Sequence, residues 1–186
     1  MSDIISRLNK INDRISEDAF LENRGLSNEV GIHVFCYDPQ DEIIVRTFFE
    51  KLIKGSSDKK YNFVVRDLYD LFIEMCDELG ITDSIQKMEE TKGKEILFKK
   101  LGSVATPEAF VKKMQYEPHE RGDILLITGV GSVYPFMRAH NILENIQHVI
   151  TDIPILMLYP GKWDGQTLEL YGKLDDGNYY RAFNLI

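Results

Sequence analysis

The chain has 186 residues, of which 44% are hydrophobic, and its 30 acidic against 22 basic residues give a formal net charge of −8. A chain of this length and composition can bury one hydrophobic core without disulfides or metals, so we expect a single domain over residues 1–186. The negative charge opposes attraction to a phosphate backbone, and we expect no direct DNA binding by the chain alone.

The compartment and the need for cofactors are also constrained by composition. Cys36 and Cys76 show no C-x-x-C spacing and no accompanying metal-ligand pattern, which favours buried thiols in a reducing compartment. No apolar run approaches the roughly 18 residues of a membrane-spanning helix. We therefore expect a cytoplasmic protein with no membrane partner, no cofactor and no metal.

The first third of the chain predicts two helices and two strands. Apolar residues at helical spacing predict a helix that ends near residue 21, and the run 32–37 predicts a strand. Asp38 is placed to cap the next helix, whose buried stripe we expect to consist of Ile44, Phe48 and Leu52. A second strand over 61–66 is followed by Asp67, a second helix cap. Strands that alternate with helices predict an α/β fold with a mostly parallel sheet and flanking helices.

A helical insertion is predicted between the second strand and the third. Residues 68–78, 81–90, 94–101 and 107–116 each show helical spacing, too many for one crossover helix. The insertion, about 81–117, could form a lid above the carboxyl edge of the sheet or a platform for a partner. Composition does not separate these two roles.

The third strand leads into a glycine turn. After the apolar run 124–127, Gly129 and Gly131 predict a tight turn into a helix. We expect Pro135 in the first turn of that helix and Arg138 on its polar side. The buried stripe of the helix is expected to consist of Phe136, Ala139, Leu143, Ile146 and Ile150.

The glycine turn lacks the residues of three common catalytic motifs. A P-loop requires a lysine and a hydroxyl directly after its last glycine, but Ser132 and Val133 follow Gly131. Tyr134 stands where a dinucleotide fingerprint requires a third small residue, and also where a nucleophile elbow around Ser132 requires glycine. Two interpretations stay open: a turn that packs strand against helix, or an anion or partner site at the helix N-terminus.

The last part of the chain predicts a fourth strand and a hairpin. The run 153–158 predicts a strand that ends at 159–161, and Trp163 is expected in the following loop. Segments 167–171 and 178–183 predict a C-terminal hairpin around an Asp-Gly turn. Aromatic and arginine side chains dominate interface energetics, which makes Trp163, Tyr179, Tyr180 and Arg181 candidate partner contacts. The helix after the glycine turn adds Arg138 and His140, although His140 also has the spacing to pair with Glu144.

Five stretches in one order resemble the BrxB family of BREX (bacteriophage exclusion) defence systems. They are GLSNE (25–29), YDPQDE (37–42), TGVGSVYPFMRAH (128–140), YPGKWDGQTL (159–168) and NYYRAF (178–183). The resemblance implies a role in phage restriction beside a DNA methyltransferase, a PglZ-type phosphatase-like protein and a large ATPase. It supplies no catalytic residue set.

Two functions from different classes follow. The first is a non-catalytic adaptor or regulatory component that binds other BREX proteins. The alternative is a nucleotide- or phosphate-binding enzyme that uses the loop 129–136 with Arg138. The missing P-loop lysine and the negative charge favour the adaptor. We expect Gly129→Val and Gly131→Val each to lower the melting temperature, because a β-branched residue fits poorly where a turn requires glycine.

Overall fold

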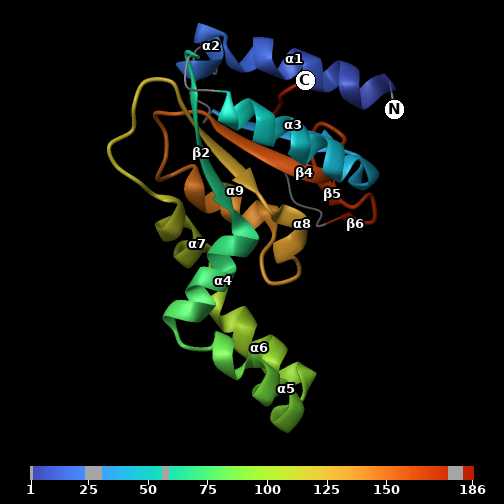
Figure 1. The fold of residues 1–186 in the computed structure, drawn as a ribbon, viewed down its shortest axis with the longest axis vertical. Coiled ribbons are helices and arrows are strands. Elements are labelled where there is room, and N and C mark those ends of the chain that lie inside the picture. Colours follow the sequence, from blue (N-terminus) through green and yellow to red (C-terminus); the bar gives the residue numbers. More distant parts are fainter. Residues whose placement is uncertain (1, 24–30, 56–58, 176–181) are drawn as a thin grey trace.

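The computed structural model describes residues 2–23, 31–55, 59–175 and 182–186. It shows a mostly parallel sheet with helices on both faces, which confirms the predicted fold class (Figure 1). Within the described residues, no helix combines the length and apolar character needed to cross a bilayer.

Four parallel strands form the centre of the sheet in the order β2-β3-β4-β1. Their bounds are β1 (Ile32–Tyr37), β2 (Asn62–Asp67), β3 (Asp123–Thr128) and β4 (Ile155–Trp163). The short strand β7 (Phe183–Asn184) pairs parallel to β1 at the outer edge. Alternate residues of each central strand reach opposite faces, so the sheet separates two hydrophobic cores.

The first core lies beneath three helices, α1 (Ser2–Ile15), α2 (Asp18–Leu21) and α3 (Glu42–Lys54). The turn η1 (Pro39–Asp41) precedes α3, and Asp38 caps it as predicted by accepting the Gln40 N–H. The predicted stripe of α3 was correct at Leu52 but wrong by one residue at its other two positions, where Val45 and Phe49 are the buried side chains. Apolar residues occupy two adjacent stripes of this helix, and contact with the sheet selects one of them.

The second core lies on the other face, beneath the helices between β2 and β4. Those helices are α4 (Leu68–Glu78), α6 (Lys94–Val104), α7 (Pro107–Met114), α8 (Val130–Val133) and α9 (Ala139–Ile146). The turn η2 (Thr82–Ser84) and helix α5 (Ile85–Lys92) connect α4 to α6. In Figure 1, α4, α5 and α6 extend away from the sheet, and we call α5 and α6 the helical arm.

The helix predicted after the glycine turn is divided in two. Helix α8 lasts one turn, and α9 starts only at Ala139. Pro135 lies between them rather than in a first helical turn, and Tyr134 before it is extended, as residues before proline prefer. Phe136 therefore leaves the predicted stripe and stacks on Phe72 of α4, with ring centroids 4.8 Å apart.

The fourth strand continues beyond its predicted end. Pro160 pairs with β1, and Gly161 to Trp163 pair antiparallel with β5 (Leu168–Leu170). A β-carbon at Gly161 would lie 2.1 Å from the Glu169 carbonyl oxygen, so glycine permits this close crossing. A C-terminal hairpin is present, but residues 178–181 of its predicted second strand lie outside the described residues, and β5 pairs with other segments. Strand β5 pairs with β4 and with β6 (Leu174–Asp175), whereas Phe183 pairs with β1.

Candidate functional site

The candidate site lies at the carboxyl edge of the sheet, where the connections that leave neighbouring strands pass to opposite faces. The connection from β1 to β2 uses α3 on one face, and the return through β3 to β4 uses helices on the other face. Strand β4 lies between β1, which continues into α3 on one face, and β3, which continues into α8 on the other, and we call this place the reversal point. Open α/β sheets bind their ligands in the crevice at such a point.

The glycine turn is built around Asp67, at the end of the neighbouring strand β2. Oδ1 of Asp67 accepts the N–H groups of Tyr69 at 2.9 Å and Asp70 at 3.2 Å, which confirms the predicted cap. Its Oδ2 accepts the Thr128 hydroxyl at 2.8 Å. Gly129 has φ +74°, and a β-carbon there would lie 2.4 Å from Oδ1 of Asp67. The positive φ and the close approach of Asp67 therefore explain why this position is glycine.

The residues that follow Gly129 do not share one environment. A β-carbon at Gly131 would lie 2.3 Å from the Tyr171 hydroxyl, and the backbone there needs no positive φ. Ser132 is exposed. Tyr134 and Arg138 line one small cavity of about 60 Å³. The structure therefore brings Tyr134 and Arg138 together and leaves Ser132 on a separate surface.

The histidine of this segment, His140, contacts its predicted partner within its own helix. Nε2 of His140 lies 3.2 Å from Oε2 of Glu144, which confirms the predicted contact one helical turn apart. Arg138 stands at the cap of α9 and not inside its first turn, so the expected polar helix side was wrong for this residue.

The pocket beside the glycine turn is acidic. Gly129 and Ser132 line a pocket of about 290 Å³ beneath α3, whose charged lining residues are Glu42, Arg46, Glu50, Asp67 and Asp70. Four carboxylates against one guanidinium oppose a phosphate. Helix α8 is also only one turn long, so it offers little macrodipole. Both observations weigh against an anion site at this turn.

Tyr37 forms the wall between this pocket and a larger one at the ends of β1 and β4. Its hydroxyl donates to Oε2 of Glu42 at 2.7 Å, and burial together with this hydrogen bond raises the pKa of Tyr37. Burial also raises the pKa of the Cys36 thiol to about 12. A thiol protonated at neutral pH is a poor nucleophile, in keeping with a structural cysteine.

Trp163 does not lie in a loop, as predicted, but at the end of β4, where it is half-buried and paired with Leu168. It lines the larger pocket. The extension of β4 past Pro160 explains the difference, because the glycine after the proline allows β5 to pair there. Tyr179, Tyr180 and Arg181 lie outside the described residues.

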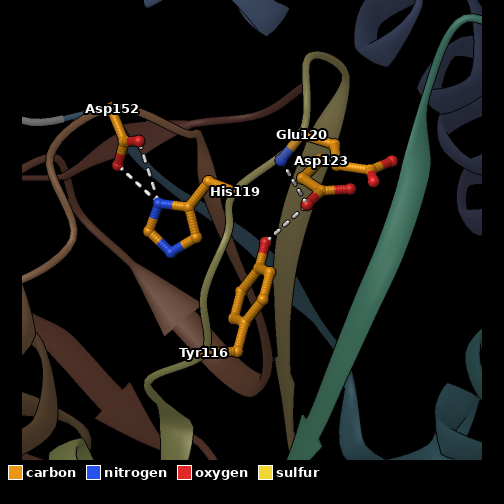
Figure 2. Close-up of polar contacts among 5 residues, drawn as sticks. All are labelled: Tyr116, His119, Glu120, Asp123 and Asp152. Atoms are coloured by element: carbon orange, nitrogen blue, oxygen red, sulfur yellow. Dashed lines mark hydrogen bonds and ion pairs between the residues drawn. The ribbon is translucent and has the colours of Figure 1, made fainter.

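A second polar cluster, at the opposite edge of the sheet, fixes the start of β3 (Figure 2). Asp123 accepts hydrogen bonds from the Asn62 amide at 3.0 Å, the Tyr116 hydroxyl at 2.9 Å and the Glu120 N–H at 3.0 Å. Although burial acts in the other direction, these hydrogen bonds lower the pKa of Asp123. Nearby, Nδ1 of His119 lies 2.8 Å from Asp152.

Sequence reasoning missed Tyr116 and Asn62 as members of this cluster. Asn62 is the register partner of Asp123, so polar residues that begin two neighbouring strands were the available signal. Tyr116 carried no such signal, because it follows α7 in a loop. Among the described residues, no three His, Cys, Asp or Glu side chains are grouped to hold a metal ion.

Tyr116→Phe tests whether the cluster is structural. The change removes one hydrogen bond to a buried carboxylate, so we expect the free energy of unfolding at pH 7 to fall by about 1–2 kcal/mol. Urea denaturation measures it. Tyr69→Phe, at an exposed tyrosine, is the control and should leave stability unchanged. Equal stability of Tyr116→Phe and the wild type would remove the assigned structural role.

Comparison with known proteins adds an independent observation. A family model described as "BREX protein BrxB" matches residues 64–185. A Bacillus cereus (strain H3081.97) protein named "BREX protein BrxB" is 34% identical over 192 residues, covering 100% of this chain and 99% of the relative. The chain belongs to the BrxB family. An Escherichia coli O9:H4 (strain HS) protein with the same BrxB name is 32% identical over 184 residues, covering 97% and 90% of the two chains. No solved structure matches the chain at a significant level.

Proposed function

We propose that the protein is a non-catalytic adaptor of a BREX phage-defence assembly, which binds other BREX proteins. The observation that carries this proposal is the BrxB relationship, which extends over nearly the whole chain. By the resemblance, the partners are a PglZ-type phosphatase-like protein, a DNA methyltransferase and a large ATPase. The glycine turn supports the proposal because it does not suit the alternative, a phosphate-binding enzyme. Its glycines permit close packing, and the pocket beside it is acidic.

The helical arm offers a surface suited to a partner. Phe136 stacks on Phe72 and lies 5.2 Å, centroid to centroid, from Phe98 of α6, which attaches the arm to the α4 side of the second core. Phe98 nonetheless remains 49% exposed, and Ile96 two residues earlier is 51% exposed. Side chains of this size left in solvent on a projecting element favour a protein contact.

Other surface groups belong to the same proposal. Arg138, exposed before α9, and Trp163 are proposed as further contacts, together with Tyr179, Tyr180 and Arg181. The alternative, an enzyme that uses the loop 129–136, receives no support from the acidic pocket or the one-turn helix.

Co-purification of BREX components with variants of the arm tests the proposal. Truncating an interface anchor typically costs about 2 kcal/mol, roughly thirtyfold in Kd. We therefore expect Ile96→Ala with Phe98→Ala to abolish recovery of a partner and to lower phage defence. Cooperative thermal unfolding should persist, because both side chains are about half exposed.

The matched control is Ile43→Ala, which removes a 70% exposed side chain from α3 on the opposite face. This variant should retain the partner. If no BREX component co-purifies with the wild-type protein, the adaptor assignment fails. If the arm variant and the control both retain a partner, the contact lies elsewhere, and Arg138→Ala and Trp163→Ala become the next variants to compare.

A further inference from the structure

The larger pocket at the carboxyl edge, about 710 Å³ in volume, lies at the reversal point of the sheet. Residues after the end of β1 and the extension of β4 form its walls. Its volume is within the range of roughly 300–1,000 Å³ that small-molecule sites occupy. Its charged and polar lining side chains are Arg7, Asp38, Gln40, Lys162, Lys173 and Asn184.

The charges of this pocket are opposite to those of the chain. Three cations face one carboxylate, in a protein whose net charge is −8. Lys162 and Lys173 make no ion pair with any described residue, and Glu169, opposite Lys162 in the β4–β5 register, is not among the lining residues. A concave site lined by one sign of charge concentrates ligands of the other sign.

Arg7 is held in place by groups that carry no charge. Its guanidinium donates to the Cys36 carbonyl at 2.6 Å and lies 4.8 Å from the centroid of the Phe35 ring. These contacts orient the guanidinium at the end of β1 without neutralising it. Asp38, the one carboxylate of the lining, is engaged by the Gln40 N–H. The pocket therefore combines one positioned guanidinium with two ammonium groups that make no ion pair with any described residue.

Aromatic side chains also line this pocket. Trp163 is half-buried and its indole Nε1 has no hydrogen-bond partner among the described residues, although a buried indole N–H usually has one. Tyr171, 39% exposed, lines the same pocket. Flat aromatic faces beside arginine and lysine suit a ligand that has both a ring and anionic groups.

We propose that this pocket binds a nucleotide-class ligand, a phosphorylated small molecule that carries an aromatic ring. Arg7, Lys162 and Lys173 contact its phosphates, and Trp163 and Tyr171 contact its ring. The proposal concerns binding alone and involves no hydrolysis. It goes beyond the adaptor function, and a ligand here would occupy the same edge of the sheet as Trp163, one of the proposed partner contacts.

Isothermal titration of the purified protein with AMP, ATP, adenosine and inorganic phosphate tests the inference. We expect AMP or ATP to bind at least tenfold more tightly than adenosine or phosphate alone, with an affinity that falls as salt rises. Lys162→Ala with Lys173→Ala should weaken nucleotide binding at least tenfold without changing the melting temperature of the free protein, because both side chains are exposed. Lys99→Ala with Lys100→Ala removes the same charge from exposed positions of α6 and should bind like the wild type.

These titrations test the nucleotide site independently of the adaptor function, because they involve no BREX partner. Absence of nucleotide binding at millimolar concentration overturns it. Equal affinity for adenosine and AMP overturns the role of the cations, and equal affinity for phosphate and AMP overturns that of the aromatic wall. Equal losses in the two lysine pairs would show attraction by overall charge and overturn the site itself.

Discussion

Replacing Gly129 with alanine is expected to lower the free energy of unfolding by about 3 kcal/mol. Holding a residue with a β-carbon at φ +74° costs roughly 1–3 kcal/mol. The new β-carbon would also lie 2.4 Å from Oδ1 of Asp67, so the cap of α4 must move. Loss of such a cap costs about 1 kcal/mol. Urea denaturation monitored by circular dichroism measures the total.

Gly131→Ala is the matched control for this prediction. The neighbouring group there is the hydroxyl end of the Tyr171 side chain, which is partly exposed, and the backbone is not strained. We expect a loss of about 1 kcal/mol or less, since a terminal side-chain atom can shift. Equal losses for the two variants would contradict the geometry assigned to the turn. The structure thus separates two glycines that the sequence treated alike.

His33→Leu is expected to make the protein less sensitive to acid. His33 is 3% exposed on β1, between the rings of Phe20 at 4.7 Å and Phe183 at 5.8 Å, and its Nδ1 has no partner among the described residues. Burial, and to a smaller extent the nearby charge of Arg14, lower the pKa of His33 from 6.5 to about 4. The folded protein therefore disfavours the protonated imidazole.

The sign and the pH window follow from this lowered pKa. Above pH 6.5 the imidazole is neutral in both states and causes no loss. Between pH 6.5 and about 4 the unfolded chain binds a proton that folded His33 does not, so stability falls by up to about 3 kcal/mol across this window. Stability curves at pH 7, 5.5 and 4 measure the difference from His33→Leu.

The control for acid sensitivity is the exposed residue His148, whose replacement by glutamine should leave the wild-type pH dependence intact. Carboxylates such as Asp123 are present in both the wild type and His33→Leu. Their contribution to the pH dependence of stability therefore cancels when the two proteins are compared. Parallel loss of stability in the wild type and His33→Leu from pH 7 to pH 4 would refute the assigned role of this histidine.

Local signals predicted the elements well where one signal was dominant. The apolar run 32–37 is β1, and the caps at Asp38 and Asp67 have the predicted hydrogen bonds. Prediction failed where tertiary contact chose between local options. The sheet selected Val45 and Phe49 over Ile44 and Phe48, and the pairing of β5 carried β4 through Pro160 and Gly161.

The candidate site was harder to predict, because its parts come from distant segments. The sequence identified the glycines and Trp163 as candidates, but it did not identify the residues that contact them in the folded protein. Tyr171 approaches Gly131 from the turn after β5, and Arg7 reaches the end of β1 from the first helix. Neither contact leaves a trace in local periodicity, since side chains from separate elements meet only after the sheet forms.

The position of β1 in the sheet sets the order in which the fold can be completed. β1 is synthesised early, yet both of its neighbours, β4 and β7, come from the last third of the chain. During synthesis, the six residues of β1, which are buried in the folded protein, have no partner strand until the later segments leave the ribosome. Such long-range closure slows folding and leaves an apolar strand edge open to other chains. A nascent copy of this protein thus depends on protection by chaperones, or on rapid docking of α1 and α3, until its final strands appear.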